Sequence, residues 1–290
     1  MNIKLNNGVE IPALGLGVLG RDAAPGVVAN SVQAAVQDGY RLIDTAAAYG
    51  NEREVGEGVR RAGISRKEIF ITTKLWLTDY GYESALKACD VSLRKLGIDY
   101  VDLYLLHWPM PSDFKATTES YRAAEKLLAD GKARAIGVSN FSPAHLASLM
   151  QSATIVPAVN QIELHPRFSQ KAHRAAHERL GIVTQSWSPL GGSVRRASQP
   201  DPLEDPTILA LAAKYRKTPA QIILRWHLDH GFSAIPKSFR PERIAENLGA
   251  LGFALSPADL VEIDGLDTGD RSGPNPDDVH ATTFPISVGD

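Results

Sequence analysis

The chain has 290 residues, of which 43% are hydrophobic and 22% charged, a composition typical of a globular protein with a large core. Its 31 basic and 33 acidic residues give a formal net charge of −2, which argues against a nucleic-acid-binding surface. The single cysteine, Cys89, excludes an intrachain disulfide, and no apolar run is long enough to span a membrane. The first four residues begin no signal peptide, so we expect a soluble cytoplasmic protein that does not act on membranes.

The chain begins with a predicted hairpin, in which Ile3–Leu5 and Val9–Ile11 alternate around an Asn-Gly turn. After it, short apolar runs alternate with helical patterns. The predicted strands are Arg41–Asp44, Ile69–Lys74, Val101–His107, Ala135–Ser139, Ala158–Glu163, Ile182–Ser186, Ala234–Lys237 and a weak run, Gly252–Leu255. The predicted helices are Val27–Asp38, Glu52–Arg61, Tyr82–Leu96, Thr117–Asp130, Pro143–Gln151, Ala172–Leu180, Pro206–Tyr215, Pro219–His230 and Pro241–Leu251.

Strands that alternate with helices over a chain of this length predict an α/β fold, a (β/α)8 TIM barrel with an N-terminal β-hairpin and extra helices. No linker or low-complexity segment divides the chain, so residues 1–290 are predicted to form a single domain. Two irregular stretches, Gly191–Asp205 and Asp267–Asp290, are predicted to be a loop and a tail.

The segment from Gly15 to Gly20 matches the dinucleotide-binding pattern G-x-G-x-x-G, but its context is wrong. The third glycine should lie in the first turn of a helix, whereas six residues intervene before the next helical pattern. We therefore expect these glycines to pass close to a ligand or around the barrel rim.

Polar residues stand where most of the predicted strands end. They are Asp44, Lys74, His107, Ser139 with Asn140, Gln161 with Glu163, and Lys237, and Tyr49 follows Asp44 in a loop. Each has an ordinary structural explanation when taken alone: Lys74 could reach solvent, His107 could be a core histidine and Asn140 could cap a helix. Because the carboxyl ends of barrel strands meet at one mouth, the set together predicts an active site there.

The chemistry that this set fits is proton donation to a carbonyl. A tyrosine titrates near ~10, and the Lys74 ammonium, held by Asp44, would favour its ionised form. A neutral His107 could orient the substrate oxygen. Nothing in the set stores a hydride, so a cofactor must deliver one.

These motifs resemble the aldo-keto reductases over nearly the whole chain. The matching segments are Leu14–Gly17, Asp44–Glu52, Lys74–Trp76, Leu106–Pro109, Gly137–Phe141, Asn160–Pro166 and Ile235–Ser238. The closest likeness is to the bacterial 2,5-diketo-D-gluconate reductase-like branch, whose short tail resembles Arg271–Pro274. The resemblance implies an NADPH-dependent reductase of keto sugars, dicarbonyls or similar small carbonyls. The sequence leaves the oligomeric state open, with a monomer as the expectation, and we expect no metal site.

The resemblance also implies a role for individual residues. The catalytic tetrad would be Asp44, Tyr49, Lys74 and His107. Ser139, Asn140 and Gln161 would hold the carboxamide of NADPH/NADP+, and Trp187 would stack on its nicotinamide. The pyrophosphate would lie near Ser188, Leu190 and the turn Gly191–Ser193, and the adenosine end near Lys237, Ser238, Phe239, Arg243, Glu246 and Asn247. Leu19, Tyr49, Trp76, His107 and Trp108 would contact the substrate.

Two departures limit what the resemblance carries over. Leu19 stands where many members have a tryptophan, so a preference for aromatic substrates cannot be assumed. Arg240 stands where a small polar residue is common, and adds positive charge near the adenosine phosphate. Specificity should reside in Pro109–Thr117, Gly191–Asp205 and the tail after Asp267.

Two other functions remain open. The same fold could serve as a cofactor-binding sensor or structural protein, which the intact tetrad argues against. A metal-dependent barrel hydrolase would need several ligands at strand ends, and His107 has too few partners. His173 and His177 have chelating spacing, but we expect them on the exposed face of an outer helix.

Overall fold

The computed structural model describes residues 1–191, 201–284 and 286–289. Its centre is an eight-stranded sheet in the order β3 to β10, with every neighbouring pair parallel. The strands are β3 (Leu16–Gly17), β4 (Leu42–Asp44), β5 (Phe70–Leu75), β6 (Val101–Leu106), β7 (Ala133–Ser139), β8 (Val159–Glu163), β9 (Val183–Trp187) and β10 (Ser233–Ala234). The predicted barrel is confirmed.

The barrel closes between β3 and β10. Bridges join Leu14 to Ala234 and Gly17 to Lys237, and the Gly17 amide donates to the Pro236 carbonyl at 3.1 Å. The eighth strand is therefore β3, and the predicted strand Gly252–Leu255 is wrong. That segment follows a 3-10 turn, Gly249–Gly252, and pairs with no strand among the described residues.

Close packing explains Gly15, which precedes β3, and Gly17, which ends it. A Cβ on Gly15 would lie 2.4 Å from the Leu42 side chain, and a Cβ on Gly17 would lie 3.0 Å from the Ile235 carbonyl oxygen. The next helix starts only at Val27. Gly17 thus helps to close the barrel and also lines the pocket at its mouth, and the late start of the helix is inconsistent with a dinucleotide fingerprint.

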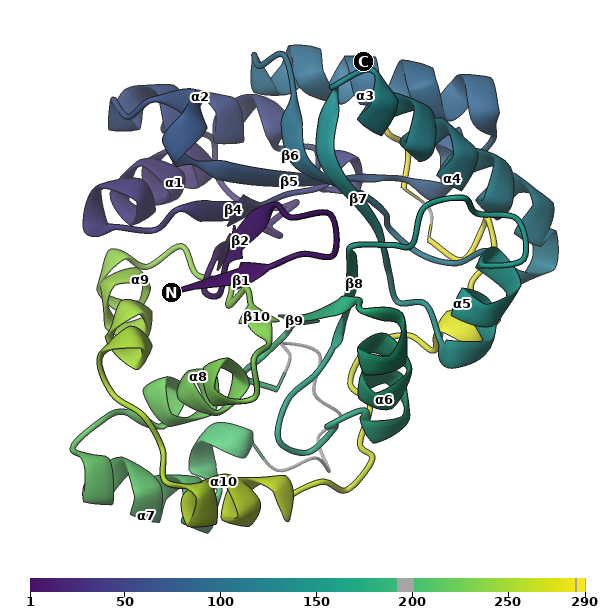
Figure 1. Ribbon diagram of the computed structural model, residues 1–290. Coiled ribbons are helices and arrows are strands. Elements are labelled where there is room, and N and C mark those ends of the chain that lie inside the picture. Colours follow the sequence, from purple (N-terminus) through teal and green to yellow (C-terminus); the bar gives the residue numbers. More distant parts are fainter. Residues whose placement is uncertain (192–200, 285, 290) are drawn as a thin grey trace.

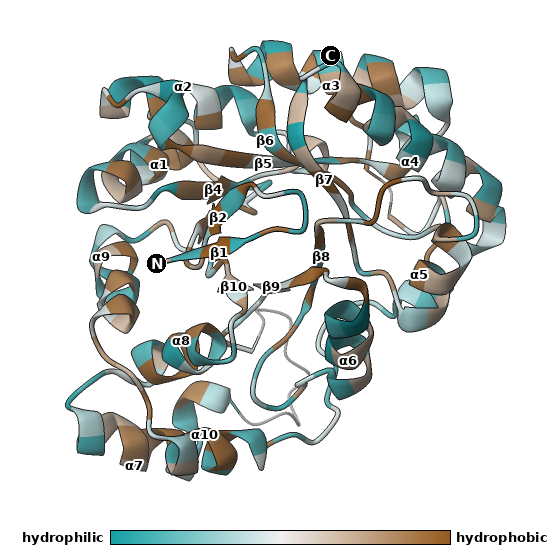
Figure 2. Cartoon of the chain, viewed as in Figure 1, coloured by the Kyte–Doolittle hydropathy of each residue, from teal (hydrophilic) through white to brown (hydrophobic). Residues whose placement is uncertain are grey.

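Helices surround the strands, and the N-terminal hairpin of β1 (Asn2–Lys4) and β2 (Glu10–Pro12) lies across one end of the ring (Figure 1). The helices are α1 (Val27–Asp38), α2 (Glu52–Ala62), α3 (Tyr82–Leu96), α4 (Phe114–Ala129), α5 (Pro143–Leu149), α6 (Lys171–Leu180), α7 (Pro206–Tyr215), α8 (Pro219–Asp229), α9 (Pro241–Leu248) and α10 (Pro257–Asp264). The sequence-based prediction missed α10. Most helices carry both hydrophilic and hydrophobic residues (Figure 2).

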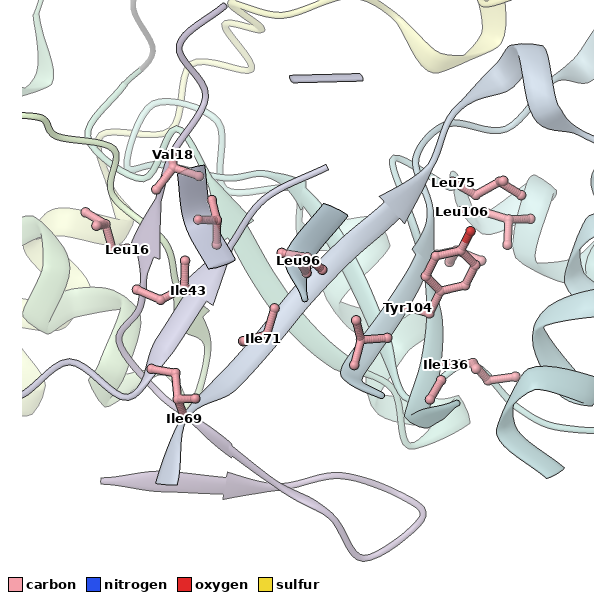
Figure 3. Packing of buried hydrophobic residues seen from close by; sticks show 14 of the residues in the cluster. Leu16, Val18, Ile43, Ile69, Ile71, Leu75, Leu96, Tyr104, Leu106 and Ile136 are labelled. Atoms are coloured by element: carbon pink, nitrogen blue, oxygen red, sulfur yellow. The ribbon is translucent and has the colours of Figure 1, made fainter. Parts of the chain in front are cut away.

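Alternation along the strands separates a cluster inside the barrel from one between the barrel and its helices. Leu42, Leu103 and Leu105 belong to one cluster, which also contains Leu5 and Ile11 of the hairpin segment and so fills the barrel interior. Strand residues of the opposite parity point outward and pack against the helices. They include Ile43, Ile71, Tyr104 and Leu106 (Figure 3). Because successive strand residues face opposite sides, this register fixes which residues at the strand ends face the barrel axis.

Candidate active site

The inward register places the predicted site residues at one mouth of the barrel. Asp44 has the same parity as Leu42, His107 the same as Leu105, and Trp187 the same as Val183. A pocket of about 300 Å³ lies at this mouth. Its lining includes these predicted residues: Leu19, Asp44, Tyr49, Trp76, His107, Trp108, Ser139, Asn140, Gln161, Trp187, Ser188 and Lys237.

Lys74 is held beneath the pocket between an acid and a phenol. Its Nζ lies 2.5 Å from Asp44 Oδ1, 2.9 Å from the Thr45 carbonyl oxygen and 3.4 Å from Tyr49 Oη. Tyr49 ends a 3-10 turn, Ala47–Tyr49, that is followed by Gly50 with φ 70° and then by α2. Gln161 donates from Nε2 to Asp44 Oδ2 at 2.7 Å, so both carboxylate oxygens are occupied.

These contacts set the charge states of the group. Burial lowers the pKa of Lys74, but the attraction of Asp44 and Tyr49 outweighs burial and raises it, so Lys74 stays an ammonium. Burial raises the pKa of the Tyr49 phenol, and Lys74 offsets this only in part. Tyr49 therefore keeps its proton at neutral pH, next to a cation that stabilises the phenolate when the proton leaves.

His107 is the fourth member of this group. It follows β6, and its ring meets those of Tyr49 and Trp76 edge to face at centroid distances of 5.7 and 5.1 Å. Burial, together with the nearby Lys74 charge, holds the pKa of His107 well below its usual range. The ring is neutral at physiological pH and can donate one hydrogen bond to a ligand oxygen.

A polar set from the next strands flanks the tetrad. Ser139 Oγ donates to the Gln161 carbonyl at 2.8 Å, and Asn140 Nδ2 donates to the His107 carbonyl at 2.9 Å. Trp187 Nε1 donates to Asn140 Oδ1 at 2.8 Å. The structure thus brings the residues assigned to the carboxamide and the nicotinamide into one connected network beside the tetrad.

The residues assigned to the pyrophosphate follow β9. Ser188 has φ 48°, Leu190 is half-buried, and Gly191 is buried with φ 101°. Of these, only Ser188 contacts the pocket. Two residues of the predicted turn, Gly192 and Ser193, lie outside the described residues, as does most of the predicted specificity loop Gly191–Asp205.

The residues assigned to the adenosine end gather where β10 is followed by α9. Lys237 lines the pocket and lies over the Phe239 ring at 4.2 Å, whereas Ser238 and Asn247 are buried and the pocket does not reach them. Glu246 is half-buried on the same helix. Three exposed basic residues, Lys237, Arg240 and Arg243, form no salt bridge within the described part of the chain. Because the first turn of α9 contributes only one acidic residue, Glu242, these three side chains leave a net positive charge there.

An apolar wall faces Tyr49 and His107. Phe284 of the tail packs between two rings, at 5.6 Å from Trp76 and 5.5 Å from Trp108. Leu19, the departure from the family pattern, is 51% exposed at the rim. The tail therefore supplies an aromatic side chain to the pocket wall, whereas Leu19 contributes an aliphatic one.

The sequence-based prediction placed specificity in the tail after Asp267, but it assigned none of the tail residues that line the pocket. Beyond Phe284, the pocket is lined by Ser272, Gly273, Pro274 and Ile286. The available signal was an isolated Phe and Ile in an otherwise polar C-terminal segment, next to the Arg271–Pro274 motif. Val18, Arg21, Ala48 and Ile235 also line the pocket and were not assigned.

Three further expectations concern the two helical histidines, a metal site and membrane-spanning helices. The expected exposure of both histidines is wrong: His173 is half-buried and His177 is buried, with its ring bridging Thr184 Oγ1 and Asn160 Nδ2 at 2.8 Å each. No group of three or more His, Cys, Asp or Glu residues that could hold a metal occurs among the described residues. None of the helices in the described ranges is both long and apolar enough to cross a membrane.

Comparisons with known proteins agree with this geometry. The Aldo/keto reductase family matches residues 13–268. The chain is 52% identical to morphine 6-dehydrogenase of Pseudomonas putida, over 97% of this chain and 96% of that protein, and 47% identical to glyoxal reductase of Bacillus subtilis, over 96% of each. The crystal structure of a Bombyx mori aldo-keto reductase in complex with NADP superimposes with a TM-score of 0.88, at 37% identity and covering 94% of this chain and 95% of that one.

Proposed function

This chain belongs to the aldo/keto reductase family, and we propose that Tyr49 is the proton donor with which it reduces carbonyl compounds. The enzyme is an NADP(H)-dependent oxidoreductase that converts aldehydes or ketones to alcohols by hydride transfer. One observation carries the role of Tyr49: its protonated hydroxyl lies 3.4 Å from a buried ammonium and lines the pocket. A phenol is a weak acid, and an adjacent fixed cation lowers the cost of its ionisation during turnover.

The other members of the tetrad act on this proton transfer. Lys74 stabilises the phenolate that forms, and Asp44 keeps Lys74 charged although both side chains are buried. The neutral His107 donates to the substrate oxygen and orients the carbonyl toward Tyr49 Oη. When bound, NADPH supplies the hydride.

The residues present fit that cofactor. Ser139, Asn140 and Gln161 offer polar side-chain atoms at neighbouring strand ends beside the tetrad, matching the donors and acceptors of a carboxamide. The Trp187 ring offers a flat face in the same pocket. Lys237 and Arg243, unpaired in the described part of the chain, would hold the phosphate of the adenosine ribose, and Ser188, Leu190 and Gly191 would border the pyrophosphate.

The pocket also limits the substrate class. Trp76, Trp108 and Phe284 give it an apolar aromatic wall opposite the polar tetrad. Such a wall suits carbonyls that carry a compact apolar or planar group, besides dicarbonyls such as those implied by the name of the glyoxal reductase relative. We further propose that the enzyme works as a cytoplasmic monomer.

The test is to follow the oxidation of NADPH at 340 nm with phenylglyoxal, methylglyoxal, a keto sugar and a keto ester, each with and without a chelator. We expect saturable turnover of at least one substrate that the chelator does not change. Cofactor binding with no turnover of any carbonyl would favour a sensor instead, and loss of activity with the chelator would favour a metal-dependent enzyme.

A further inference from the structure

Glu163 is a buried carboxylate that none of the proposed chemical steps uses. It ends β8 and is 1% exposed. Its carboxylate accepts from the Ser272 amide at 2.7 Å, the Ser272 hydroxyl at 2.5 Å and the Gly273 amide at 2.9 Å, and His165 Nε2 lies 3.2 Å away. All three tail donors come from two residues that lie 109 and 110 positions further along the chain.

These hydrogen bonds hold the tail in contact with Trp187. Glu163 pairs with Trp187 in the register of β8 and β9, so the carboxylate is next to the base of the tryptophan. A Cβ on Gly273 would lie 2.4 Å from Trp187 Cη2 and 3.0 Å from Glu163 Oε2. Only glycine fits between the carboxylate and the ring.

Trp187 is therefore held at two edges. Its Nε1 is bonded to Asn140, and its far edge, at Cη2, is covered by Gly273. Ser272, Gly273 and Pro274 line the same pocket as Trp187. Burial alone would raise the pKa of Glu163, but its hydrogen bonds outweigh burial and lower the pKa. Glu163 is therefore ionised, and an ionised carboxylate is well suited to accept the bonds that hold the tail.

We propose that Glu163 is a positioning residue that clasps Ser272 and Gly273 onto Trp187 and so completes the wall of the pocket at its nicotinamide end. The proposal rests on the proposed function for its catalytic consequence, but the clasp itself is a structural claim that can be tested without substrate. Glu163→Gln keeps the shape of the side chain and replaces one acceptor oxygen with a donor, which faces the amides and hydroxyl of the tail.

The first measurement is limited trypsin digestion, because the clasped bond Arg271–Ser272 is a trypsin site and no Lys or Arg follows it. Cleavage of a transiently opened segment tracks the population of its open form, and loss of a charge-assisted bond should raise that population about ten- to a hundredfold. We expect Glu163→Gln to release the fragment Ser272–Asp290 faster than wild type by this factor. Ser272→Ala, which keeps both backbone donors, should show a smaller increase.

Asp270→Asn is the matched control. It makes the same change of charge in the same tail, but Asp270 is only half-buried and its carboxylate bonds only Thr268 among the described residues. We expect it to be cut at the wild-type rate. Gly273→Ala tests the clasp from the side of the tail and should also release the fragment faster than wild type. It keeps the proposal testable if Glu163→Gln fails to fold.

The second measurement separates positioning from general stability. Glu163→Gln should raise the KM for the carbonyl and the Kd for NADPH several-fold, with kcat at saturation within about threefold of wild type, since it loosens a binding wall and leaves the tetrad intact. The proposal is overturned if Glu163→Gln and Gly273→Ala are cut no faster than Asp270→Asn, or if they are cut faster with both constants unchanged. If wild type reduces no carbonyl, the proposed function fails, and the digestion rates with the Kd for NADPH still decide the clasp.

Discussion

Trp187 donates its indole N–H to Asn140 Oδ1 at 2.8 Å, and this bond fixes the orientation of the Asn140 amide. An indole nitrogen can only donate, so the amide oxygen must face it and the NH2 group must face the carbonyl of His107, 2.9 Å away. Asn140 adopts φ 65°, a conformation that asparagine tolerates better than most residues. The ends of β6, β7 and β9 are thus connected through one side chain, and the proposed platform for the nicotinamide is linked to the residue after β6.

Replacing Trp187 should weaken cofactor binding. We expect Trp187→Leu to raise the Kd for NADPH about tenfold, because an aromatic contact beyond its buried area is worth about 0.5–1.5 kcal/mol and the leucine also covers less of the ring. Trp187→Phe keeps a flat ring and should lose less. The measurement is a fluorescence titration with NADPH. An unchanged Kd and unchanged quenching in Trp187→Leu would assign the quenching to Trp76 or Trp108 and contradict the stacking.

Tyr49→Phe should abolish most carbonyl reduction while leaving NADPH binding nearly intact. The phenol acts only during proton transfer, and general acid catalysis is typically worth about 10²–10⁴-fold in rate. The measurements are kcat with a small aldehyde and the Kd for NADPH on the same preparation. Near wild-type kcat would remove Tyr49 from the role of proton donor.

Lys74→Met should damage both activity and stability. It leaves Asp44 buried without its cation, and breaking a buried ion pair by removing one partner typically costs about 3–5 kcal/mol. The double change Asp44→Asn with Lys74→Met should recover much of the stability but none of the activity. Urea denaturation and kcat together check this; a double variant no more stable than Lys74→Met would mean that the pair is not coupled as its 2.5 Å contact indicates.

Most of this site could be predicted from the sequence, because the polar residues stand at the ends of apolar runs and the alternation of a strand fixes which of them face inward. Asp44, Lys74 and His107 follow from that rule. The strand that closes the barrel could not be predicted in this way. Only Leu16 and Gly17 form β3, which is too short to show alternation. The partner of Gly17 across the closure, Lys237, is known only once the barrel is folded.

The clasp between Glu163 and the tail is a second feature that the sequence pattern does not contain. Glu163 was recognised as one more polar residue at a strand end, and Ser272 and Gly273 as part of a tail. Their contact depends on how the segment after α10 crosses the barrel mouth. Local patterns carry no information about so distant a pairing.

Buried histidines should make the protein sensitive to acid. Burial, together with the nearby His173, lowers the pKa of His177 to about 3, whereas an unfolded chain takes up this proton near ~6.5. A lowered folded-state pKa means that the unfolded state binds more protons as the pH falls. The stability is therefore complete above about pH 6.5 and is lost between that value and about pH 3.

The slope of this loss can be measured. Each such histidine contributes up to about 1.4 kcal/mol of unfolding free energy per pH unit. His177→Gln can keep the bonds to Asn160 and Thr184 and cannot titrate. We expect urea denaturation between pH 6.5 and 5 to show a shallower slope in this variant, with buried His227 still contributing in both proteins. Equal slopes would mean that His177 does not stay neutral in the folded chain.

The basic residues at the start of α9 should make the enzyme prefer NADPH to NADH. The two cofactors differ by the phosphate on the adenosine ribose, and Lys237, Arg240 and Arg243 are exposed there without an acidic partner in the described ranges. A charge-assisted hydrogen bond contributes about 1.5–3 kcal/mol, less where solvent screens it, so two contacts should favour NADPH by roughly 10²-fold. Arg243 offers a planar fork that suits phosphate oxygens, and burial lowers the pKa of Lys237 without a carboxylate to oppose it.

The test is the double variant Lys237→Ala with Arg243→Ala. In it, the Kd for NADPH should rise much more than the Kd for NADH, and high salt should narrow the difference between the two Kd values in wild type. Glu242→Gln, on the same exposed turn, is a control that removes a negative charge and should not weaken NADPH binding. Equal losses for both cofactors in the double variant would mean that these side chains hold a part of the molecule that NADH and NADPH share.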